Sequence, residues 1–152
     1  MSELTTTKKV FKSPNTIYYW FTLFAFCFVA YQQVQDTIRP NYTGGNLIII
    51  YLLGVAPNFF PSIGMPALFV TLIPQMKQTS KWFNEKKHIT ANIISIIGLV
   101  SWEFLQPMTK RGQFDWNDVL WTLIGAIVFQ IIWTMTPSKY RQSYVEKYTN
   151  QQ

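Results

Sequence analysis

The chain has 152 residues, of which 49% are hydrophobic, 17% aromatic and only 13% charged, and its formal net charge is +6. Average soluble proteins carry about 25% charged residues, so this composition argues against an ordinary soluble domain. Cys27 is the only cysteine, which excludes a secreted scaffold held by disulfides. One cysteine and one histidine also cannot complete the usual ligand set of zinc, so we expect neither a metal nor another cofactor.

The charged residues are bunched, and three long stretches contain none of them. Residues 13–35, 40–76 and 119–138 are free of Asp, Glu, Lys and Arg. A transmembrane helix needs roughly 20 predominantly apolar residues. The sequence therefore predicts an all-α, polytopic membrane protein that forms a single domain over residues 1–152.

The first predicted span covers residues 17–34 and follows a basic segment, residues 1–12. A basic segment before an apolar run also resembles a signal peptide, but Phe28 stands where cleavage would need a small residue. We therefore expect an uncleaved first helix. The aromatic residues 18–20 at its start favour the membrane interface.

The second apolar stretch, residues 47–74, contains three prolines and is longer than one crossing requires. Proline removes a backbone donor and clashes with the preceding turn, so we predict that the helix breaks near residues 57–61. Two arrangements fit this pattern. Either residues 47–56 lie along the outer interface and residues 58–74 cross, or the whole stretch crosses as a broken helix.

The third and fourth predicted spans cover residues 89–106 and 118–135. Eighteen residues of helix extend about 27 Å, which suits a bilayer core. If residues 47–74 cross once, ten of the 13 Lys and Arg residues lie on one side, and the positive-inside rule places both termini in the cytoplasm. We thus predict four transmembrane helices with cytoplasmic ends at 1–12 and 139–152. This topology accounts for the basic residues, and we expect no nucleic-acid partner.

Polar side chains gather at the predicted outer ends of the third and fourth spans. Glu103 lies inside the third span, where ionisable residues are costly and usually face a cavity or a partner. Gln106 follows on the same helical face. Asn58 lies between two prolines of the second span, and interrupted helices often line binding sites. The candidate ligand-binding residues are Glu103, Gln106, Arg111, Asp115, Asp118 and Asn58.

Most of these residues also have a purely structural interpretation. Asp115 is placed to cap the fourth helix, with Asp118 at the third helical position as in a capping box. Glu103 would simply pair with Arg111. Gly125, two turns after Asp118, would let two helices approach closely. His88, at the cytoplasmic edge among lysines, is expected to be solvated.

One set of these residues resembles the C-terminal signature of the VanZ-like family of bacterial membrane proteins. The set is Glu103-x-x-Gln106, Arg111, Phe114-Asp115, Asp118 and Gly125, and it covers about 25 residues of the chain. The resemblance implies a multi-pass protein of the bacterial inner (plasma) membrane; one family member is associated with resistance to the glycopeptide teicoplanin. The family's earlier Asp-Lys-x-x-His motif is absent, and residues 57–61 stand roughly where it would fall.

Three functions fit this pattern. The leading hypothesis is a small envelope protein whose outer polar cluster binds a lipid-linked or cell-wall-related molecule, with membrane lipids as its other partners. The alternatives are a structural or interaction subunit of a membrane complex, and a membrane enzyme with Glu103 as general base. We assign no catalytic residue, because the sequence shows no nucleophile–base pair, and we favour a protein that is not an enzyme. The oligomeric state is left open.

Overall fold

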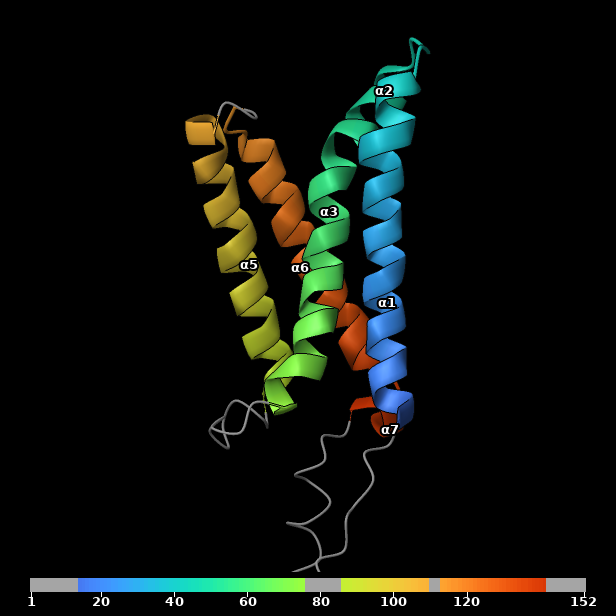
Figure 1. Cartoon of the computed structure of the whole chain (residues 1–152), viewed down its shortest axis with the longest axis vertical. Coiled ribbons are helices and arrows are strands. Elements are labelled where there is room, and N and C mark those ends of the chain that lie inside the picture. Colours follow the sequence, from blue (N-terminus) through green and yellow to red (C-terminus); the bar gives the residue numbers. More distant parts are fainter. Residues whose placement is uncertain (1–13, 76–85, 110–112, 142–152) are drawn as a thin grey trace, which may run out of the picture.

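The computed structural model describes residues 14–75, 86–109 and 113–141, and these segments are helical apart from short connections (Figure 1). Four long helices run alternately up and down. They are α1 (Pro14–Gln32), α3 (Leu47–Leu72), α5 (Lys87–Leu105) and α6 (Trp116–Met135). Shorter elements extend or connect them: η1 (Gln33–Ile38), α2 (Arg39–Asn41), η2 (Ile73–Gln75), η3 (Gln106–Thr109) and α7 (Ser138–Arg141).

Three of the helical segments are long and apolar enough to cross a membrane, namely Leu47–Leu72, Lys87–Met108 and Trp116–Met135. The structure therefore confirms the predicted all-α fold and three of the four predicted membrane-spanning segments as helices that could cross a membrane. Their outward faces carry exposed apolar side chains, such as Ile48 (70% exposed) and Ile97 (62%). Soluble monomers rarely expose large continuous apolar patches, whereas such a surface suits contact with lipid. The chain is a multi-pass membrane protein.

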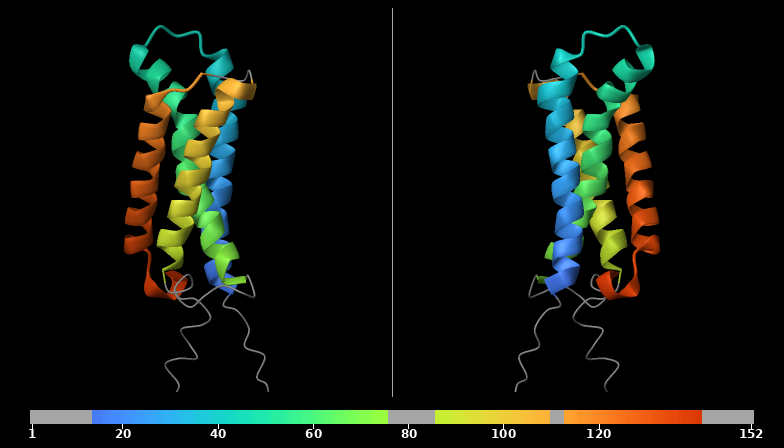
Figure 2. Two further views of the ribbon diagram at one scale, coloured as in Figure 1. Left: turned by 90° about the vertical axis from the view of Figure 1, so that its left-hand side faces the viewer. Right: turned by 90° about the vertical axis from the view of Figure 1, so that its right-hand side faces the viewer.

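Helix α3 corrects one prediction, because it runs unbroken through Pro57, Pro61 and Pro66. Figure 2 shows its first turns inclined to the rest of the helix, so the chain bends here instead of breaking. Each proline removes one backbone donor, and neighbouring helices make such losses tolerable in a membrane helix. Residues 47–56 are thus the beginning of one long helix.

Helix α3 is also the centre of the fold, since α1, α5 and α6 all pack against it. Two glycines permit the closest approaches. A Cβ atom on Gly64 would lie 2.9 Å from Cβ of Cys27 in α1. A Cβ atom on Gly125 of α6 would lie 2.8 Å from the carbonyl oxygen of Phe59 and would collide with the Ser62 hydroxyl. The predicted role of Gly125 in close helix packing is confirmed.

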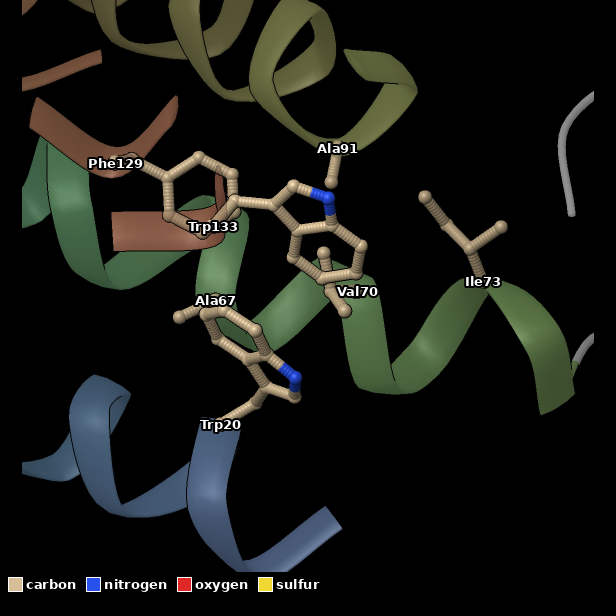
Figure 3. Close-up of a cluster of buried hydrophobic side chains, with 7 residues drawn as sticks. All are labelled: Trp20, Ala67, Val70, Ile73, Ala91, Phe129 and Trp133. Atoms are coloured by element: carbon tan, nitrogen blue, oxygen red, sulfur yellow. The ribbon is translucent and has the colours of Figure 1, made fainter. Parts of the chain in front are cut away.

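The apolar core lies near the lower end of the bundle in Figure 1, where α1 begins and α6 ends (Figure 3). Trp20 is fully buried, and its ring stacks on Trp133 with centroids 4.9 Å apart. Its Nε1 atom donates a hydrogen bond to the carbonyl oxygen of Tyr140, 2.8 Å away. Tyr18 and Tyr19 are exposed, as an interface position requires, but Trp20 belongs to the core.

Candidate ligand-binding site

A cavity of about 680 Å³ opens at the upper end of the bundle, opposite the core, and all four long helices or their extensions line it. Four of the six candidate residues lie in its wall: Asn58, Gln106, Asp115 and Asp118. Arg111 lies outside the described residues. Glu103 does not line the cavity, but it hydrogen-bonds to Gln106, which does.

Glu103 is almost completely buried, with 1% of its surface exposed. Its Oε1 atom accepts a hydrogen bond of 2.8 Å from Nε2 of Gln106, which confirms that the two share a helical face. Its Oε2 atom is buried and has no hydrogen-bond partner within the described segments. A buried polar atom without a partner costs free energy, and such atoms often mark sites that a water or ligand completes.

Asp115 caps α6, as predicted. Its carboxylate accepts a hydrogen bond of 2.8 Å from the backbone N–H of Asn117, and α6 begins at the next residue, Trp116. A carboxylate at this position satisfies a free backbone donor and interacts favourably with the helix dipole. Because the cap sets the residue at which α6 begins, it also sets the position of Asp118 in the first turn of the helix.

Asp118 interacts with a neighbouring helix, although a capping box within α6 was expected. Its carboxylate is stabilised by the side chain of Asn58 in α3 and by the positive charge of Arg39 in α2. Asp118 thereby faces residues of two other helices at the cavity wall. Its charge, like that of Asp115, also acts on Glu103, so three carboxylates share this end of the bundle.

Three further residues of the cavity wall were missed in the sequence. Arg39 and Gln35 come from the extension of α1, and Oε1 of Gln35 is buried without a partner in the described part of the chain. Phe28, Tyr31, Gln35 and Arg39 recur every three or four residues, a helical stripe that could have identified them. Residues 33–38 form a π-helix, a distortion that is frequent at functional sites.

Tyr51 is the third missed residue, and it connects the first turns of α3 to α6 by hydrogen bonds. Its hydroxyl donates a hydrogen bond of 3.0 Å to Oδ1 of Asn117 and accepts one of 2.9 Å from Nε1 of Trp121. The ring of Trp121 also packs edge-on against Phe59, with centroids 5.8 Å apart. These contacts hold the wall of the cavity in a defined position.

No protein-family model, curated protein or solved structure matches the chain. The resemblance to the VanZ-like family therefore stays a prediction from the motif residues. Within the described ranges, no group of three or more His, Cys, Asp or Glu side chains is arranged to hold a metal ion. What this arrangement can do chemically is to offer hydrogen-bond acceptors and one guanidinium to a bound molecule.

The polarity of the cavity changes in the same direction along two helices and their extensions. From α1 through η1 into α2 the lining residues run from Phe28 to Arg39, and from α5 into η3 they run from Leu99 to Gln106. The lining of α3 is mixed, because Gly54, Val55 and Pro57 lie above Asn58 and Met65 lies below it. The cavity is therefore polar at the upper end of the bundle and apolar toward its middle.

Proposed function

We propose that the protein crosses the bacterial inner membrane four times, with α1 as the additional span and both termini in the cytoplasm. At 19 residues, α1 extends about 28 Å, close to the thickness of a bilayer core. The start of α1 and the end of α7 meet at the lower end of the bundle, where Oγ1 of Thr16 donates a hydrogen bond of 3.2 Å to the carbonyl oxygen of Lys139. An even number of crossings accords with this contact, and the distribution of basic residues directs the upper end outward.

The upper cavity, in this proposal, binds a lipid-linked or cell-wall-related molecule in the outer leaflet. The observation that carries the proposal is the common direction of polarity along α1 with its extension and along α5 with η3. A lipid-linked molecule has the same order, with a polar head at the membrane surface and an apolar chain below it. Ligand sites are typically apolar clefts with a few placed polar groups, and 680 Å³ lies within their usual size range.

Two unsatisfied acceptors, one in the cavity wall and one on the residue that hydrogen-bonds to Gln106 of that wall, indicate which head the cavity recognises. Oε2 of Glu103 and Oε1 of Gln35 both lack a donor among the described residues. A head that carries hydroxyl, amide N–H or ammonium groups would supply those donors. Arg39 in the same wall offers a planar fork of donors to an anionic group such as a phosphate. The VanZ-like resemblance of residues 103–125 supports an envelope role of this kind.

A second candidate is a structural subunit of a membrane complex. It is favoured by the polar contacts between helices at the same place: the Tyr51 hydroxyl hydrogen-bonds with Asn117 and Trp121, and Asn58 acts on Asp118. In that case these polar residues stabilise the bundle, and the cavity holds only solvent or bulk lipid. Measurements of bound mass and stability on the same sample separate the two candidates.

Filling the apolar half of the cavity tests the proposal. Met65 lines the cavity, and Met65→Trp adds side-chain volume without charge. Native mass spectrometry after gentle detergent extraction should show a discrete bound species on the wild type and at least a tenfold smaller bound fraction on the variant. Met135→Trp, on a methionine that is 78% exposed at the lower end, is the control and should retain the species.

A thermal melt of the same samples shows whether the loss of the bound species in Met65→Trp is caused by unfolding. The proposal fails if the wild type carries no discrete species, or if the two tryptophan variants retain it equally. A lower melting temperature with unchanged bound mass would favour the structural candidate.

A further inference from the structure

A group of basic side chains at the lower end of the bundle takes no part in the upper cavity. His88 belongs to the first turn of α5, and Arg141 is the last residue of α7. The imidazole of His88 stacks on Trp133 with centroids 4.8 Å apart and an angle of 7° between the rings. This half-buried position corrects the expectation that His88 is simply solvated.

Both side chains have a buried nitrogen atom that lacks a hydrogen-bond partner among the described residues. Nδ1 of His88 and Nε of Arg141 are buried and make no hydrogen bond within the part of the chain that the structure describes. Such unpaired nitrogen atoms on two separate elements are unusual, because buried polar atoms are normally satisfied. The two side chains as a whole are only half-buried, so a molecule at the lower surface can contact their exposed parts, and a small rotation of either side chain would bring its unpaired nitrogen atom to that surface.

The electrostatic surroundings of His88 are positive. The charges of Lys87 and Arg141 both act on its imidazole, and Nζ of Lys87 lies 5.6 Å above the ring of Trp133. The first turn of α5 contains no acidic residue, and no side chain caps its N-terminus. The positive end of the helix dipole therefore adds to these charges. An anion bound here would relieve this repulsion and supply the missing acceptors.

We infer that His88 and Arg141 form a phosphate-binding site at the lower end of the bundle. Arg141 donates from its guanidinium fork and His88 from Nδ1, while the stack on Trp133 holds the imidazole in place. A phosphate group has the charge and the several acceptor oxygens that such a pair of donors requires. The group belongs either to an anionic phospholipid or to free phosphate. The inference does not depend on the function of the upper cavity.

Because His88 is the only histidine in the chain, its imidazole can be observed without ambiguity. The full-length protein, labelled with ¹⁵N-histidine, is placed in phosphatidylcholine nanodiscs. The imidazole resonances are then followed as phosphatidylglycerol replaces phosphatidylcholine. A second series adds inorganic phosphate at constant ionic strength. The site predicts a saturable shift, with a midpoint at least fivefold higher in Arg141→Gln and changed less than twofold in Lys139→Gln.

The Lys139→Gln variant removes the same charge from the same short helix, so it controls for general attraction of anions. A response to phosphatidylglycerol alone identifies the lipid as the source of the phosphate, and a response in both series identifies the phosphate group itself. Arg141→Lys, which keeps the charge, should retain more of the response than Arg141→Gln if the latter still folds. The inference is overturned if neither series gives a saturable shift, or if Lys139→Gln weakens the response as much as Arg141→Gln.

Discussion

Replacing Gly125 with leucine should destabilise the protein by about 1–3 kcal/mol or more, because overpacking a tight contact forces neighbouring groups apart. A Cβ atom at this position already collides with the Ser62 hydroxyl and lies 2.8 Å from the carbonyl oxygen of Phe59. The backbone of Phe59 cannot move without displacing α3, the helix on which the others pack. A thermal melt in detergent should show a clear fall in melting temperature.

Gly98→Leu is the matched control, because a Cβ atom on Gly98 of α5 has no neighbour within 4 Å. Its melting temperature should remain near that of the wild type. In a second pair, Gly125→Ala should be destabilising and the added Ser62→Gly change should restore part of the loss by removing the colliding hydroxyl. Equal effects of leucine at positions 98 and 125 would contradict the close packing of α3 against α6.

Replacing Glu103 with glutamine should weaken retention of the bound species roughly ten- to hundredfold, since a hydrogen bond to a charged group contributes about 1.5–3 kcal/mol. Glutamine keeps a carbonyl oxygen that can accept from Gln106, but it replaces the buried, unpartnered Oε2 with an N–H₂ group, so a water or ligand group that reaches this position loses its acceptor. The melting temperature of the empty protein should not fall. The change replaces one of three neighbouring carboxyl groups with a neutral amide and leaves the shape almost unchanged.

The matched control is Asp36→Asn, which removes a negative charge from an exposed position at the same end of the bundle. The fraction of protein that still carries the bound species is followed by native mass spectrometry through serial dilution. Asp36→Asn should retain the species like the wild type. If Glu103→Gln lowers the melting temperature and leaves retention of the bound species unchanged, Glu103 stabilises the helix bundle and the ligand-binding account is wrong.

Much of the local structure could be predicted, because it depends on residues close together in the chain. The spans α3, α5 and α6 follow from runs of apolar residues, and the Asp115 cap follows from its position just before such a run. The pairing of Glu103 with Gln106 follows from helical periodicity alone. These features need no knowledge of which helix packs against which.

The features that sequence analysis missed depend on contacts between helices. The rule that proline ends a helix holds for exposed segments, but α3 is surrounded by other helices and continues through three prolines. Asp118 was assigned to its own helix end, because nothing in the sequence places Asn58 beside it. His88 was expected in solvent, because its stacking partner Trp133 lies 45 residues away in the chain. The four-span topology and the VanZ-like resemblance stay predictions.

The most direct test of the central claim is to identify what touches the cavity in the native membrane. A photoreactive benzoylphenylalanine is introduced at Leu99, which lines the cavity, or at Ile97, which is 62% exposed on the same helix. After illumination of intact cells, the account predicts one discrete lipid-linked adduct at Leu99, lost when Glu103→Gln is added, and only bulk phospholipid at Ile97. The same mixture of phospholipid adducts at both positions would contradict it.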